Sequence, residues 1–203
     1  MTDTASPRRA RKDAAANRLG LLSAAARTLA HDPTASVDTI ARAAGLSRRA
    51  LYGHFDDRDA LVRELIATGA ERFNAIAERV DDTASAPVVL ARLALSLWDG
   101  AAHVQFAAAI ALDDTHVGDT AAVLTPLRRR VLRLVERGRD EGTLRTDLSA
   151  PTVARLIEEA ARTVVTRLDG ARPDAADVAA RAILGVAGLS WREADAVLRT
   201  ARS

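Results

Sequence analysis

Residues Val37–Phe55, VDTIARAAGLSRRALYGHF, decide how the rest of this chain is organised. The pattern predicts a helix over residues 37–44 and a second over residues 48–54, joined by a tight turn at Gly45. Glycine suits such a turn because it adopts the left-handed backbone at little cost. A serine precedes each helix, where an N-cap hydroxyl is favoured. We interpret the stretch as a helix-turn-helix.

The second of these helices has an apolar side and a polar side. Leu51 and Phe55 lie four residues apart and should face inward. Arg48 and Arg49 then point outward near the start of the helix, where an arginine can grip a guanine edge through two hydrogen bonds. The hydroxyl, imidazole and guanidinium groups nearby can donate hydrogen bonds to phosphate oxygens. The candidate DNA-binding residues are Thr39, Arg48, Arg49, Ala50, Tyr52, His54 and Arg58.

Helical patterns continue on both sides of the helix-turn-helix. Apolar residues at three- and four-residue spacing predict a helix over about residues 13–30, which ends before Pro33. A long helix over about residues 58–80 should leave the first unit without a flexible linker. Pro126 falls inside a later pattern, so we expect a kink or a later start there. The further predicted helices span residues 87–100, 102–114, 119–141, 151–169, 173–189 and 191–201.

Ala and Leu dominate the apolar residues, which favours an all-α fold of about nine or ten helices. We divide the chain into a flexible basic arm (1–12), a helix-turn-helix DNA-binding domain (13–60) and a C-terminal effector-binding and dimerisation domain (61–203). The long helix joins the last two domains. The arm, with arginines at positions 8, 9 and 11 and Lys12, is either a solvated tail or a source of phosphate contacts.

Charge and composition narrow the classes of partner. Residues 1–60 hold ten Lys and Arg against seven Asp and Glu, so the positive excess lies at the end that would meet a polyanion. The chain has no cysteine, which excludes disulfides and thiolate metal sites. The longest apolar runs are about twelve residues and too polar to span a bilayer, so we expect no membrane partner and a cytoplasmic protein.

The helix-turn-helix closely resembles the N-terminal domain of the TetR/AcrR family of bacterial transcriptional regulators. The resemblance rests on IARAAGLS (Ile40–Ser47), LYGHF (Leu51–Phe55) and DRDAL (Asp57–Leu61), and it extends from about Ala14 to Ile66. It implies that the positions of Arg48, Arg49, Tyr52, His54 and Arg58 contact DNA. Two positions depart from the family pattern: relatives usually carry Lys at position 58 and often Thr or Ser at position 50.

The resemblance also implies that the C-terminal domain binds a small effector and forms a homodimer. Apolar walls with a few polar groups would make a pocket, although core packing explains each aromatic as well. The candidate pocket residues are Phe73, Trp98, His103, Phe106, Asp113 and His116. The helices over 151–169 and 173–189 carry small and branched residues suited to a dimer face or to closing the monomer core. The candidate interface residues are Val164, Val165, Ile183, Val186 and Leu189.

Enzyme chemistry finds little support in the sequence. The chain lacks a Gly-rich phosphate loop, a zinc-protease helix motif and a Gly-x-Ser-x-Gly elbow. Asp113 and His116 could share a helix face, but two ligands do not make a metal site, so no metal or cofactor is expected. The predicted function is a ligand-responsive transcriptional repressor that binds a palindromic operator in double-stranded DNA as a homodimer. The alternative is a helical module that binds small molecules or partners and has a vestigial DNA-binding head.

Overall fold

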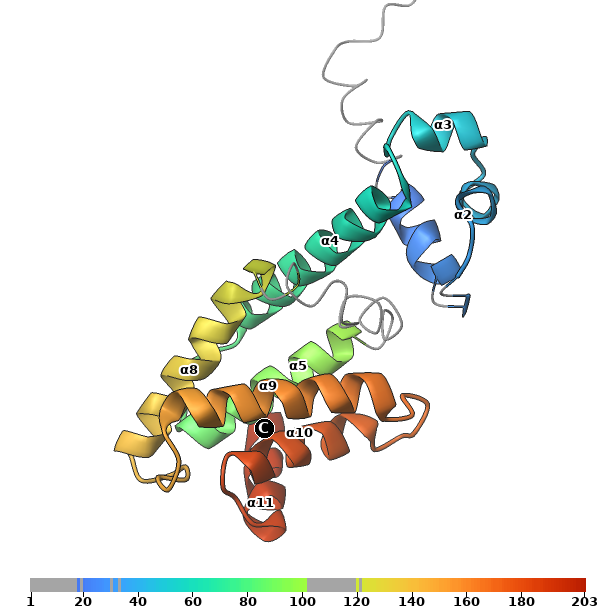
Figure 1. Cartoon of the computed structure of the whole chain (residues 1–203). Helices are drawn as coiled ribbons and strands as arrows, with labels where there is room; N and C mark the ends of the chain where they lie inside the picture. Colours follow the sequence, from blue (N-terminus) through green and yellow to red (C-terminus); the bar gives the residue numbers. More distant parts are fainter. Residues whose placement is uncertain (1–17, 19, 30, 33, 102–119, 121) are drawn as a thin grey trace, which may run out of the picture. The chain divides into compact units, whose positions relative to one another are not determined.

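The computed structural model describes residues 18, 20–29, 31–32, 34–101, 120 and 122–203 (Figure 1). Within them every regular element is a helix, as the sequence predicts. After a first helix that includes residues 20–29, the helices are α2 (Val37–Ala43), α3 (Arg48–Tyr52), α4 (Arg58–Arg79), α5 (Ala86–Ala101), α8 (Thr125–Asp140), α9 (Ala150–Arg167), α10 (Ala175–Val186) and α11 (Trp191–Arg202). No helix of the described residues is long and apolar enough to cross a membrane.

The chain divides into two compact units, residues 1–65 and residues 66–203. The boundary falls within α4, which runs without interruption from Arg58 to Arg79. The predicted absence of a flexible linker between the long helix and the first unit is therefore confirmed. The basic arm, residues 1–12, lies outside the described residues.

In the first unit, local capping hydrogen bonds define where the two helices of the helix-turn-helix begin. The Ser36 and Ser47 side chains accept hydrogen bonds from the backbone of the first turns of α2 and α3. Gly45 has a φ of 69°, the left-handed backbone that the turn requires. Leu51 and Phe55 are buried, as predicted. The predicted end of α3 at position 54 is wrong, since α3 ends at Tyr52 and a glycine, which favours helix ends over interiors, follows.

The second unit is a helical bundle around α5. Helix α10 packs against α5, α9 and α11, and α8 packs against α5 and α9. The core draws buried residues from α5, α8, α9, α10 and α11, among them Leu90, Val135, Val153, Leu184 and Leu198. Most of these are aliphatic or alanine, as the scarcity of aromatics in the sequence predicts. The predicted start of α10 at residue 173 is wrong, because Pro173 lies in the preceding turn.

Helix α8 starts at Thr125 with Pro126 in its first turn, which confirms the later start expected from the proline. Leu124 stands at the N-cap and offers no capping side chain. Asn74 of α4 takes that role: its Oδ1 accepts from Leu127 N at 3.2 Å, and its Nδ2 donates to Val123 O at 2.9 Å. A side chain of one helix thus caps the start of another.

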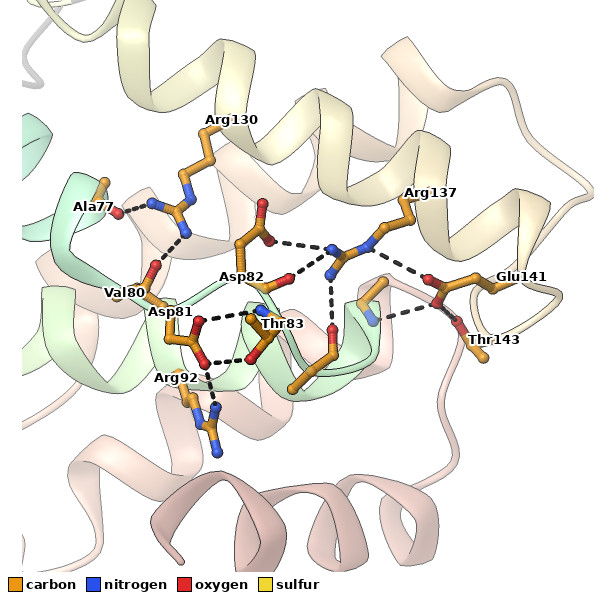
Figure 2. A network of polar contacts seen from close by, with 12 residues as sticks. Ala77, Val80, Asp81, Asp82, Thr83, Arg92, Arg130, Arg137, Glu141 and Thr143 are labelled. Carbon is orange, nitrogen blue, oxygen red and sulfur yellow. Dashed lines mark hydrogen bonds and ion pairs between the residues drawn. The ribbon is translucent and has the colours of Figure 1, made fainter.

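Arginines of α8 also hold the C-terminal end of α4 and the loop after it (Figure 2). Arg130 donates to the carbonyl oxygens of Ala77 and Val80. Arg137 donates to Asp82 O at 2.9 Å and to Ala84 O at 3.0 Å. The basic run of α8 is therefore not simply a solvated face, because half-buried arginines in it donate to backbone carbonyls at the end of α4 and in the loop after it.

Candidate nucleic-acid interface

The outer face of α3 presents a cluster of polar side chains. Arg48, Arg49 and His54 are exposed, and Tyr52 keeps 40% of its surface accessible although it is aromatic. Ala50 is half-buried between them. These groups face outward because Leu51 of the same short helix is fully buried. The structure thus brings together the predicted contacts Arg48, Arg49, Ala50 and Tyr52 on α3, and His54 follows just beyond the end of the helix.

Two other predicted contacts lie at the edges of this face. The Thr39 hydroxyl lies 3.0 Å from Ser36 Oγ at the start of α2 and is half-buried. Arg58, at the first position of α4, is also half-buried, and its Nε lies 3.5 Å from Ala35 O. Arg58 therefore links the start of α4 to the loop before α2, in addition to any contact it makes with phosphate.

Arg48 has two neighbours that shape its position. Its Nη1 lies 3.2 Å from Oδ2 of Asp38 on α2, and its guanidinium carbon lies 5.5 Å from the centre of the Tyr52 ring. Tyr52 first, and Asp38 after it, raise the pKa of Arg48 above its ordinary value. These contacts favour the charged form of Arg48, and the contact with Asp38 places its guanidinium on the side of α3 that faces α2.

Behind α3, Arg18 of the first helix supports the motif. Its Nε donates to Glu64 Oε1 at 2.6 Å, and its guanidinium carbon lies 4.6 Å from the centre of the Phe55 ring. Its Nη1 also reaches His54 O at 3.4 Å. The hydrogen bond with Glu64 raises the pKa of Arg18. These contacts join the first helix, the end of α3 and α4 within one unit.

Sequence reasoning did not single out Asp38, Arg18 or Glu64. Asp38 lies ten positions before Arg48, and Arg18 lies 46 positions before Glu64. Neither spacing carries a helical signal, since only pairs three or four residues apart share a helix face. The sequence offers one signal for the Asp38–Arg48 pair: Asp38 is an acidic residue within the helix-turn-helix, next to the candidate DNA contact Thr39.

Two of the candidate pocket residues lie in the described part of the chain. Trp98 keeps 6% of its surface accessible and packs against Ala175 and Ala179 of α10, with Val164 and Val165 of α9 at the edge. Phe73 is half-buried on α4. The other candidates, His103, Phe106, Asp113 and His116, lie outside the described residues. Among the described residues, no cluster of three or more His, Asp or Glu could hold a metal ion.

Two shallow cavities flank the end of α4. One, of about 310 Å³, is lined by residues that include Asn74, Glu78 and Arg130. The other, of about 430 Å³, is lined by residues that include Ile76, Arg92 and Asp99. The described linings of both are partly charged and include neither Phe73 nor Trp98.

The candidate interface residues on α9 and α10, and Leu189 just beyond α10, differ in exposure. Ile183 keeps only 8% of its surface accessible and belongs to the core of its own unit. Val186 and Leu189 are half-buried against that core. Larger apolar surface lies at Leu156 and Trp191, which are 41% and 63% exposed, and neither was named from the sequence.

Comparison with known proteins agrees with this geometry. Residues 21–65 match the family described as bacterial regulatory proteins, tetR family. The region includes the whole helix-turn-helix. A search of curated proteins returned no match.

Solved structures show the same fold. The TetR-family transcriptional regulator PfmR of Thermus thermophilus matches with a TM-score of 0.69 and 19% identity, over 88% of this chain and 97% of that one. KstR2 of Mycobacterium tuberculosis, a ketosteroid transcriptional regulator, matches with a TM-score of 0.68 and 23% identity, over 84% of this chain and 93% of that one. The transcriptional regulator FadR of Bacillus subtilis, in complex with stearoyl-CoA, matches with a TM-score of 0.71 and 15% identity, over 84% of this chain and 98% of that one.

These three similar proteins are transcriptional regulators. Residues 21–65 therefore match the tetR family of bacterial regulatory proteins, and the described residues have the fold of solved TetR-family transcriptional regulators.

Proposed function

We propose that this protein is a ligand-responsive transcriptional repressor that binds a palindromic operator as a homodimer. The observation that carries the proposal is the outer face of α3, where Arg48, Arg49 and Tyr52 are exposed above the buried Leu51. Exposed cations on a short helix with a buried apolar side fit the major groove of DNA.

Different residues of this face contact the bases and the phosphates. Arg48 and Arg49, at the start of α3, read base edges, and Ala50 offers an apolar contact. Tyr52, His54 and Arg58 donate to phosphate oxygens and fix the register. Thr39 contributes a hydroxyl at the start of α2. Arg58 also stands at the positive end of the α4 dipole, which adds to the attraction of a phosphate there.

Dimerisation would place two copies of α3 on neighbouring half-sites. A short recognition helix has little affinity alone, and a two-fold dimer on a palindrome uses it twice. We assign the interface to α9 and α10, with Val164, Val165, Val186 and Leu189 at its centre and Ile183 supporting them from the core. The domains are those of the sequence analysis, a DNA-binding domain over 13–60 and an effector and dimer domain over 61–203.

The effector is a small molecule held within the C-terminal domain. The FadR structure, which has a similar fold, is in complex with stearoyl-CoA, and this supports an effector bound within the fold. We assign the pocket to Phe73, Trp98, His103, Phe106, Asp113 and His116. An effector lowers DNA affinity only through its difference in affinity between the DNA-bound and free conformations. The site of action is the bacterial cytoplasm, where the chromosome lies.

The proposal is tested by selecting duplexes from a random-sequence pool with the purified protein at moderate salt. Enrichment of one palindromic sequence, lost when Arg48 and Arg49 are both replaced by alanine, supports it. A pool without enrichment would overturn the DNA-binding claim. Combined with binding of a metabolite to the same preparation, that result would favour the alternative of a small-molecule module with a vestigial head.

Repression and dimerisation need separate measurements. Light scattering of the free protein and of its complex with the selected duplex gives the number of chains. Two chains on one palindrome are expected. A single chain on the duplex would remove the dimer from the proposal and leave DNA binding in place. A promoter carrying the selected duplex should be silenced by the protein, and activation there would contradict the repressor assignment.

A further inference from the structure

We infer that Asp38 is a specificity-determining residue: by holding Arg48, it directs that guanidinium to a base edge and away from the phosphates. The inference rests on the proposed function, because it assumes that α3 enters DNA. It adds an acidic residue of α2, which does not itself have to touch DNA, to the residues that decide which sequence is bound.

The geometry of the pair is asymmetric. Asp38 Oδ2 lies 3.2 Å from Arg48 Nη1. Oδ1 is shielded from solvent and accepts no hydrogen bond from a described residue. The contact with Arg48 is therefore the main polar compensation of this carboxylate, and its loss would leave an incompletely paired charge on the surface that meets DNA.

The remaining donors of Arg48 are enough to read a base. A guanidinium has five N–H groups, and the ion pair with Asp38 occupies one edge. The Tyr52 ring, 5.5 Å from the guanidinium carbon, borders the group on another side. An arginine held in this way keeps a pair of parallel N–H groups for the O6 and N7 atoms of guanine. Its freedom to swing toward a phosphate is reduced.

Asp38 also penalises binding to the wrong sequence. If Arg48 leaves Asp38 for a phosphate, the carboxylate is exposed beside the polyanion without its partner, and like charges repel. On the correct sequence the pair persists and the penalty does not arise. The carboxylate is half-exposed, so the effect should be modest and should weaken at high salt.

The test compares the affinities of wild type and Asp38→Asn for two probes, the duplex selected from the random pool and a scrambled duplex of the same composition. The variant should bind the scrambled duplex more tightly and the selected duplex no better, so that the ratio of the two affinities falls about twofold to fivefold. Its affinity for the scrambled duplex should also fall more steeply with salt, by about one unit of slope, because Arg48 gains a phosphate contact.

Asp56→Asn is the matched control, since it removes one exposed carboxylate from the same unit and leaves the Arg48–Asp38 pair intact. It should leave the affinity ratio unchanged. If Asn at position 38 weakens α2, Asp38→Glu keeps the acid in the first turn of the helix and moves the carboxylate. That variant should lose affinity for the selected duplex alone.

A double-mutant cycle with Arg48→Met separates action through Arg48 from a general charge effect. In the Arg48→Met background, Asp38→Asn should no longer change the affinity ratio. An equal change in both backgrounds, or an unchanged ratio in the wild-type background, would overturn the inference. Wild-type protein that fails to discriminate between the two duplexes would instead overturn the proposed function.

Discussion

The Nε atom of Arg18 lies 2.6 Å from Oε1 of Glu64, so one ion pair joins the first helix to α4 across 46 positions of sequence. Replacing Arg18 by methionine should lower the free energy of unfolding of the first unit by about 1 kcal/mol, because the partly exposed pair and the contact with the Phe55 ring are both lost. Urea unfolding of the variant measures the change.

Arg63→Met is the control for this pair. Arg63 lies 4.0 Å from Asp57, and both side chains are more than half exposed. Its replacement should change the stability by no more than about 0.5 kcal/mol. Equal losses in the two variants would show that the Arg18 contacts add nothing to an ordinary surface pair.

Gly45 and Gly69 form a matched pair for the turn. A Cβ atom at either position would meet nothing within 4 Å, so packing plays no part in the comparison. Gly45 has a φ of 69°, and alanine there should cost about 1 kcal/mol. Gly69 lies inside α4, where alanine should stabilise by about 0.5–1 kcal/mol. Thermal unfolding of the two variants should therefore shift in opposite directions.

Replacing Tyr52 by phenylalanine isolates the hydroxyl. The variant keeps the aromatic ring beside Arg48 and loses the hydroxyl that makes the proposed phosphate contact. Affinity should fall about tenfold for the selected duplex and for an unrelated one, because phosphate contacts carry no sequence information. Fluorescence anisotropy with both duplexes measures this. Unchanged affinity with unchanged stability would remove Tyr52 from the set of contacts.

Asn74 should contribute more to the stability of the fold than a half-buried amide on a helix surface usually does. Asn74→Leu leaves Val123 O and Leu127 N without their side-chain partner, at a cost of about 2 kcal/mol. Hydrogen exchange at the Leu127 amide should accelerate in the variant. Glu71→Ala, an exposed change on the same helix, should leave that amide as protected as in the wild type.

The start of α11 gives a prediction for acid stability. Ser190 and Glu193 form a capping box, and hydrogen bonds from Ser190 lower the pKa of Glu193 below its ordinary value near 4.5. A lowered pKa in the folded state means that the stabilisation is complete above the ordinary value and is lost as the pH falls through the lowered one. Glu193→Gln keeps an acceptor but cannot titrate, so it should flatten this part of the acid unfolding profile. Ser190→Ala should cost about 1 kcal/mol at neutral pH.

Local chemistry explains which features could be predicted from the sequence. The caps at Ser36 and Ser47, the left-handed Gly45 and the late start of α8 depend on residues within one turn of the feature. The face of α3 was predictable for the same reason, since Leu51 alone fixes which side of that short helix is buried.

Contacts between distant segments could not be predicted in this way. The role of the α8 arginines depends on the carbonyls that they reach at the end of α4 and in the loop after it, some fifty positions earlier in the chain. The burial of Ile183 and Trp98 depends on how α5, α9 and α10 pack. An alternating or helical pattern identifies an apolar face, but it does not tell a core from an interface or a pocket, because all three need the same residue types.

The unbroken course of α4 through the boundary between the two units limits how the protein can be recombined. A chimera that joins this DNA-binding head to the body of another regulator must be spliced inside a helix. Each residue inserted or deleted there turns everything that follows by about 100° and shifts it by about 1.5 Å. Only splices that keep the helical phase should transmit a foreign signal, so functional fusion points along α4 should recur with the period of the helix.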